Sequence, residues 1–295
     1  MTAITYAAPA LQFSDDVSTF YLIETEAATV EWIEMASLAQ LQFMLRGTAP
    51  VQPFAGMKTD LADIGLIGPR NSAAYVQMNG PVRIFGFGLL PQGWLAAARR
   101  PASDFADQAQ DARVCVCGRI AQAYARLCEA KSFRDMTKIA EKYLAIVTSM
   151  ADAPPTPLIH AIQAWLLSSP NPKIADLLAQ SGLSEAQAQR HCKALFGAPP
   201  KLLARKYRAL RMAKQIAQGQ CDWQSEADRV FYDQSHCIRE LRHFVGLTPS
   251  AIQTRARLSP RSRYLQPPMA GLQTFGRSYD LLGLAPAGSP FATLH

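Results

Sequence analysis

The sequence lacks the features that mark membrane and exported proteins. No window holds 18 uninterrupted apolar residues, which excludes a membrane-spanning helix. The first residues show no basic segment followed by an apolar run, so we expect no export signal. Charged residues make up 18% of the chain and apolar residues 49%, a composition typical of a globular protein. We therefore expect a cytoplasmic protein that does not bind membranes.

Residues that carry catalysis or bind metals are also scarce. Residues 1–150 contain no histidine, which argues against acid–base chemistry there, and no Ser/His/acid set is evident. The six cysteines are irregularly spaced, which favours reduced thiols over disulfides. A single residue separates Cys115 from Cys117, and on a helix this spacing turns the two thiols to different faces. We expect no enzymatic activity, no metal and no cofactor.

The net charge of +7 is unevenly distributed along the 295 residues. Residues 154–263 contain 16 Lys and Arg but 7 Asp and Glu, a net charge of +9, whereas the rest of the chain carries −2. A basic segment beside a mildly acidic one fits a nucleic-acid-binding module joined to a domain with another role. A solvated charged face explains the charge equally well.

The first third of the chain has the pattern of short strands separated by turn residues such as Asn79-Gly80-Pro81. The expected strands are 19–24, 29–35, 41–47, 62–68, 73–78 and 82–90. Their number and spacing predict a small β-sandwich or barrel. Apolar residues at helical spacing then predict two helices, 113–130 and 134–150. These helices either pair with a second copy of the chain or pack against the strands, through Tyr124, Leu127, Tyr143 and Val147.

A proline-rich linker around residues 153–157 separates this part from an all-helical one. We therefore predict one domain over 1–152, a second over 153–257 and an irregular Pro- and Gly-containing tail over 258–295. The expected helices of the second domain are 158–168, 173–180, 185–196, 201–218, 223–229 and 233–244, and a last short helix begins near Thr248-Pro249-Ser250.

Two segments of the second domain have the form of a helix-turn-helix. In residues 175–196, Gly182 suits a left-handed C-cap and Ser184 an N-cap, and the outward residues are polar or basic. Residues 230–244 have the same pattern, with Asp233 as the expected N-cap of the second helix. A plain helical hairpin has the same periodicity. The helix between the two units is rich in Lys and Arg, which suits contact with phosphates.

Residues 182–216 and 231–252 resemble AraC/XylS-type transcription regulators. The second stretch is the more specific, with its Asp-Gln-Ser-His run followed in order by Arg, Gly and Thr-Pro-Ser. The strand-rich front half more weakly resembles the cupin-like sensory domain of some family members. The resemblance implies an α+β multidomain protein, with an N-terminal cupin-like barrel carrying two helices and two helix-turn-helix units joined by a long helix.

The resemblance also places the residues that contact DNA. The expected base-contacting residues are Ala186, Gln189, Arg190, Lys193, Gln234, Ser235, His236 and Arg239. Gln and Arg read base edges bidentately in the major groove, and the Ala186 methyl can contact a thymine methyl. The expected phosphate-contacting residues are Lys201, Arg205, Lys206, Arg208 and Arg242. Val230 stands where the family places glycine; because β-branched residues disfavour positive φ, we expect a distorted first helix in the second unit.

Together these patterns predict a sequence-specific DNA-binding transcription regulator tuned by a ligand or partner of the N-terminal domain. The expected partners are double-stranded DNA, a small-molecule effector, a second copy of the chain and RNA polymerase. The alternative is a protein-interaction module whose degenerate helix-turn-helix half no longer binds DNA. The two differ in salt dependence, because phosphate contacts make affinity fall steeply with salt.

Overall fold

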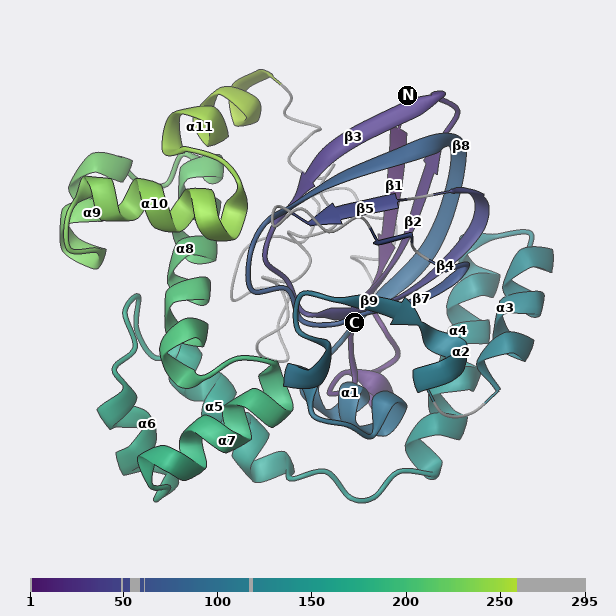
Figure 1. Ribbon diagram of the computed structural model, residues 1–295, viewed down its shortest axis with the longest axis horizontal. Helices are drawn as coiled ribbons and strands as arrows, with labels where there is room; N and C mark the ends of the chain where they lie inside the picture. The colour runs from purple at the N-terminus through teal and green to yellow at the C-terminus, as the bar shows by residue number, and fades with distance from the viewer. Residues whose placement is uncertain (1, 49, 54–58, 61, 117–118, 259–295) are drawn as a thin grey trace.

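A computed structural model describes residues 2–48, 50–53, 59–60, 62–116 and 119–258 of the chain (Figure 1). Strands fill the first part and helices the second, and the two parts lie side by side. The predicted α+β organisation, a sheet followed by a helical part, is confirmed. The tail expected over 258–295 lies outside the described residues, except that Leu258 ends the last helix.

The sheet is antiparallel and is organised around one long strand, β8. Its strands are β1 (Thr2–Ala7), β2 (Val17–Thr25), β3 (Thr29–Glu34), β4 (Ala39–Thr48), β5 (Pro50–Pro53), β6 (Thr59–Asp60), β7 (Ile64–Ile67), β8 (Ala74–Leu89) and β9 (Ala109–Asp111). The order is β1-β2-β8-β4-β7-β9, while β3 and β5 pair with the first part of β8. Among the described strands β1 and β9 do not pair, so the sheet is open and does not close into the expected barrel.

Successive side chains of a strand point to opposite faces of the sheet, and one face, rich in aromatic residues, is buried. Phe85 on β8 lies opposite Leu22 of β2 and Phe43 of β4, and Phe87 points to the same side. This face is covered by α1 (Pro91–Ala98), α3 (Ile120–Glu129) and α4 (Phe133–Ser149), and a short helix, α2 (Ala112–Cys115), lies nearby. The sheet region therefore has its own apolar core.

The two helices expected over 113–130 and 134–150 pack within the chain. Leu127, Tyr143 and Val147 are at most 3% exposed and belong to the core under the sheet. The Tyr124 hydroxyl donates to the carbonyl of Met44, at 2.7 Å. Of the two roles considered for these residues, packing against the strands is the one observed, because their apolar surface is already buried inside the chain.

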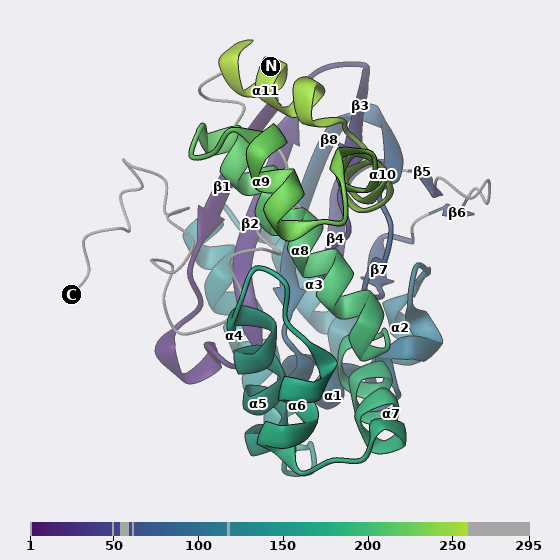
Figure 2. The same cartoon turned by 90° about the vertical axis from the view of Figure 1, so that its left-hand side faces the viewer.

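The helical region follows the expected pattern closely. Its helices are α5 (Thr156–Leu167), α6 (Ile174–Ser181), α7 (Glu185–Phe196), α8 (Pro200–Gln218), α9 (Trp223–Val230), α10 (Gln234–Val245) and α11 (Pro249–Leu258). Helix α8 runs as a rod between α5–α7 at one end and α9–α11 at the other (Figure 2). Its 19 residues span about 28 Å at 1.5 Å per residue. No described helix is long and apolar enough to cross a membrane.

The expected distortion of the second unit is wrong. Helix α9 is regular from Trp223 to Val230, and the Asp222 side chain caps its first turn by accepting from two backbone N–H groups. The chain leaves the helix at Phe231 with extended angles, φ −110° and ψ 176°. Because the turn needs no positive φ, Val230 is tolerated where a glycine was expected, and it is buried in the core of the helical region.

Candidate nucleic-acid interface

Helix α7 is positioned by the turn that precedes it. Gly182 takes the left-handed conformation, φ 67° and ψ 11°, which ends α6 and reverses the chain. Ser184 and Gln187 then form a capping box: the Ser184 hydroxyl accepts from the Gln187 N–H at 3.3 Å, and the Gln187 side chain accepts from the Ser184 N–H at 2.9 Å. Cys192 and Leu195 are buried, which fixes the opposite face of α7 toward solvent.

All four expected base-contacting residues of α7 are exposed: Ala186, Gln189, Arg190 and Lys193. They are spread along the helix from its first turn to its last, where Lys193 stands. The face therefore combines hydrogen-bonding and cationic side chains with one small apolar residue, which is the chemistry that base edges require.

Helix α10 begins in the same manner. The Asp233 carboxylate caps it by accepting from the His236 N–H at 2.6 Å. Ser235, Arg239 and Arg242 are exposed, while Gln234 and His236 are half-buried. Tyr232 stands next to the cap and is 90% exposed, an extreme value for so large a side chain. Sequence reasoning missed Tyr232, although its place beside the Asp-Gln-Ser-His run was a usable signal.

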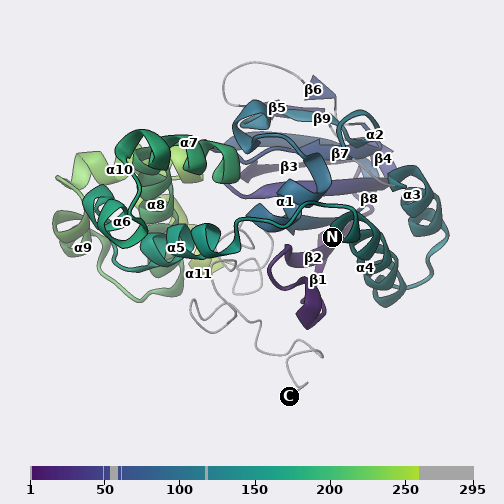
Figure 3. The same cartoon turned by 90° about the horizontal axis from the view of Figure 1, so that it is seen from below.

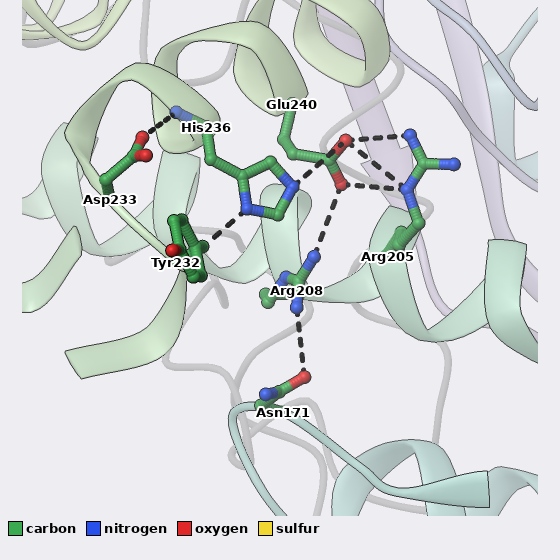
Figure 4. Close-up of polar contacts among 7 residues, drawn as sticks. All are labelled: Asn171, Arg205, Arg208, Tyr232, Asp233, His236 and Glu240. Carbon is green, nitrogen blue, oxygen red and sulfur yellow. Dashed lines mark hydrogen bonds and ion pairs between the residues drawn. The ribbon is translucent and has the colours of Figure 1, made fainter. Parts of the chain in front are cut away.

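The His236 ring is held on three sides, and Figure 4 shows the two polar contacts, with Tyr232 and Glu240. Its Nδ1 accepts from the Tyr232 N–H at 3.4 Å, and its Nε2 lies 3.8 Å from a Glu240 carboxylate oxygen. The ring of Phe231 meets it edge-on, with centroids 5.7 Å apart. Of the polar residues at the start of α10, His236 is therefore the one most committed to contacts inside the protein.

Glu240 forms a charged node between α10 and α8, and sequence reasoning missed it. Its buried carboxylate accepts from Arg205 at 2.7 Å and from Arg208 at 3.4 Å. Burial acts to raise the pKa of Glu240, but the hydrogen bond from Arg205 and the charges of Arg205, Arg208 and His236 hold that pKa below its usual value. The available signal was an acid four residues after His236, facing a helix rich in arginine.

Several basic residues of α8 point into the protein. Arg208 also donates to the Asn171 side chain at 3.0 Å, in the connection between α5 and α6 (Figure 4). Arg211 donates to the carbonyls of Ser169 and Leu166 at the end of α5. Burial lowers the pKa of both guanidinium groups. These arginines therefore join α5–α7 to α9–α11 through the rod.

The expected phosphate-contacting residues separate into two groups. Lys201 and Arg242 are exposed, and the Arg205 side chain, although paired with Glu240, is 40% exposed. Lys206 is 1% exposed and donates to the carbonyl of Ser37 at 2.7 Å. A phosphate contact at Lys206 does not fit this position, and the Arg208 side chain, at 11% exposure, is largely withdrawn as well.

The cysteines were expected to be reduced thiols, and the structure describes five of the six. Five cysteines are described and all are free: Cys115, Cys128, Cys192, Cys221 and Cys237. Cys117 lies outside the described residues. Burial raises the pKa of the Cys192 and Cys237 thiols to about 12. Within the described ranges no three His, Cys, Asp or Glu side chains converge as metal ligands.

Comparisons with known proteins give distant structural likenesses. No protein-family model and no curated protein sequence matches this chain. ToxT from Vibrio cholerae, in its P21 crystal form, is similar over 88% of this chain and 98% of its own, with a TM-score of 0.44 and 9% identity. ToxT from Vibrio cholerae O395 covers 88% and 97%, with a TM-score of 0.44 and 8% identity. The AraC-like transcriptional activator CuxR covers 70% and 86%, with a TM-score of 0.30 and 10% identity.

Proposed function

We propose that this chain is a sequence-specific DNA-binding transcription regulator of the AraC/XylS type. The observation that carries the proposal is the placement of α7 and α10. Each is the second helix of a helix-turn-helix, each begins with a side-chain cap, and each presents polar or basic residues to solvent. Figures 2 and 3 show both helices on the same side of α8. Two reading helices on one side of a rod can approach one face of a duplex.

The length of the rod suits this geometry. Successive major-groove segments on one face of B-DNA lie about 34 Å apart, and α8 spans about 28 Å between the two units. Side chains from the middle of the rod tie it to both units: Arg211 donates to the end of α5, and Arg205 donates to Glu240 on α10. A rigid spacer of this length lets both helices enter the groove one helical turn apart.

Charge supports a polyanionic partner. Residues 154–263 carry a net charge of +9, while Glu240 is neutralised by arginines inside the protein. Lys201 and Arg242 remain exposed beside the reading helices. These two cations are the best-placed phosphate contacts, together with the exposed part of Arg205.

The sheet region is the proposed regulatory part. It has its own aromatic core, and through Met35 and Ala36 it also contributes to the apolar core of the helical region. A small-molecule effector or a second copy of the chain that binds to the sheet can therefore change the position of the DNA-binding helices through this shared core. RNA polymerase is the further partner expected of a transcription regulator.

The test is selection of duplexes from a random library by the full-length chain, followed by affinity measurements at several salt concentrations. The proposal predicts an enriched sequence whose binding constant falls with salt by about 0.9 logarithmic units per phosphate contact and per tenfold salt. Lys142→Ala serves as the control because Lys142 is exposed on α4, away from α7 and α10. Enrichment of no sequence, with salt-insensitive or undetectable binding, would favour the protein-interaction alternative.

A further inference from the structure

Two connections of the sheet form a paired segment that faces the helical region. Residues 35–38 join β3 to β4, and residues 69–73 lie in the connection from β7 to β8; together we call these two segments the clasp. Ser37 and Arg70 exchange two backbone hydrogen bonds, each 3.2 Å long. A buried ion pair between Arg70 and Glu34, 3.3 Å long, anchors the clasp to the end of β3. The clasp is therefore part of the sheet framework.

The clasp caps the C-terminal end of α10. The last carbonyls of a helix have no partner within the helix and must find one elsewhere. Here the Ala73 N–H donates to the carbonyl of His243 at 2.8 Å, and the Ala36 N–H donates to that of Phe244 at 2.7 Å. Both bonds join backbone groups of the sheet region to the helix that carries Ser235 and Arg239.

The same clasp holds the C-terminal end of α7 and the middle of α8. The Asn71 side chain donates to the carbonyl of Gly197, the residue that ends α7, at 3.2 Å. Between the two helix ends, the buried Lys206 ammonium donates to the carbonyl of Ser37. One segment of the sheet region thus touches both reading helices and the rod that separates them.

We propose that the clasp is a specificity-determining element that fixes the separation and relative rotation of α7 and α10, and so the spacing of the two base sequences that the chain reads. This inference rests on the proposed DNA-binding function. A reading helix held at its C-terminal end keeps its N-terminal residues free for the groove. A shift of the sheet at the clasp would move both helices together relative to DNA.

Four glycines provide a matched test, because all four end helices in the left-handed conformation. Gly197 and Gly246 have φ of 78° and 76°, and Gly182 and Gly219 have φ of 67° and 66°. A Cβ on Gly197 would lie 2.8 Å from Pro69, and one on Gly246 would lie 2.4 Å from Ile33 and 3.1 Å from Ala73. A Cβ on Gly182 or Gly219 meets nothing within 4 Å. Alanine therefore strains all four backbones alike, but only at Gly197 and Gly246 does it push against the clasp or, through Ile33, against the strand that leads into it.

The experiment uses the full-length chain and a duplex that the wild type selects from a random library. Two base pairs are inserted between the two footprinted segments, which rotates one segment by about 70° relative to the other. We expect the wild type, Gly182→Ala and Gly219→Ala to lose about tenfold or more in affinity for the lengthened duplex. Gly197→Ala and Gly246→Ala should lose no more than about threefold, because the freed helices can adjust.

Hydrogen exchange at the Ala36 and Ala73 amides gives an independent readout. Both amides should exchange faster in Gly246→Ala than in the two control variants, because that substitution pushes on Ile33 and Ala73. Unchanged exchange there, or an equal spacing penalty in all four variants, overturns the inference while leaving DNA binding intact. A wild type that selects no sequence instead overturns the proposed function, and this inference with it.

Discussion

The carboxylate of Glu240 on α10 accepts from Arg205 on α8 through two atoms, with Nη2–Oε1 at 2.7 Å and Nε–Oε2 at 3.1 Å. Arg208, one turn further along α8, reaches the same carboxylate and also the Asn171 side chain. Glu240 thus joins the second reading helix to the rod, and Arg208 joins the rod to the connection between α5 and α6 in the first unit. The arginines that the sequence assigned to phosphate contact are, in this fold, partly structural.

Replacing Glu240 should destabilise the folded chain. In Glu240→Gln the two arginines lose their counter-charge, and because Arg205 is 40% exposed we expect a loss of about 1–2 kcal/mol in the free energy of unfolding. Urea unfolding measures it. Glu226→Gln is the control, because Glu226 pairs with the exposed Arg229 within α9, and its cost should stay below about 1 kcal/mol. Equal costs for the two variants would show that the node contributes no more than a surface pair.

Lys206 should make stability depend on pH. Burial lowers its pKa to about 7 in the folded chain, from an ordinary value of 10.5 for a lysine in water. Between these values the unfolded chain binds more protons, so the free energy of unfolding rises with pH. From pH 7 to about pH 9 we expect the wild type to gain about 2 kcal/mol relative to Lys206→Met. Parallel pH profiles for the two proteins would contradict this assignment.

Arg190 and Lys201 should have different roles in binding. Arg190→Ala should reduce discrimination between the selected duplex and a single-base variant by about 1–3 kcal/mol. Lys201→Ala should weaken binding to all duplexes alike and lower the slope of log affinity against log salt by about one. Both side chains are exposed, so neither change should alter stability. The same loss on selected and random duplexes for both variants would refute the division of roles.

Tyr232 should contribute to DNA affinity without contributing to the fold. Because its side chain is 90% exposed, Tyr232→Ala should leave the thermal midpoint unchanged. The contact between the Tyr232 backbone N–H and His236 survives the substitution. We expect a loss of about 1 kcal/mol or more in binding free energy, and Tyr232→Phe separates the ring from its hydroxyl. Unaltered affinity in Tyr232→Ala would place the ring away from DNA.

The helices of the second half could be predicted from the sequence because their signals are local. Ser184, Gly197, Gly219 and Gly246 mark helix ends through their own side-chain and backbone chemistry, and each stands at or next to an observed end. The strands were harder to predict. Asn79-Gly80-Pro81 is typical of a turn, so two strands were expected over 73–78 and 82–90, but β8 runs through these residues as one strand.

The inward direction of Lys206 could not be predicted. Lys201 and Lys206 look alike in sequence, and only the packing of α8 against the clasp, whose Ser37 is 169 residues earlier, buries one and exposes the other. The contacts of the clasp with the helices could not be predicted from the sequence for the same reason. Its partners are backbone carbonyls, which every residue carries, so no residue type indicates their pairing.

If α7 and α10 read two major-groove segments of one duplex, methylation of guanine N7 within those segments should block binding, and methylation interference measures this. The full-length chain is bound to its selected duplex, and modified guanines that block binding are mapped on both strands. We expect two clusters of blocking guanines on one face of the duplex, with centres about 10 base pairs apart. Arg190→Ala should remove blocking guanines from one cluster alone. A single cluster, or no interference at any guanine of a bound duplex, would show that the two helices do not read the duplex together.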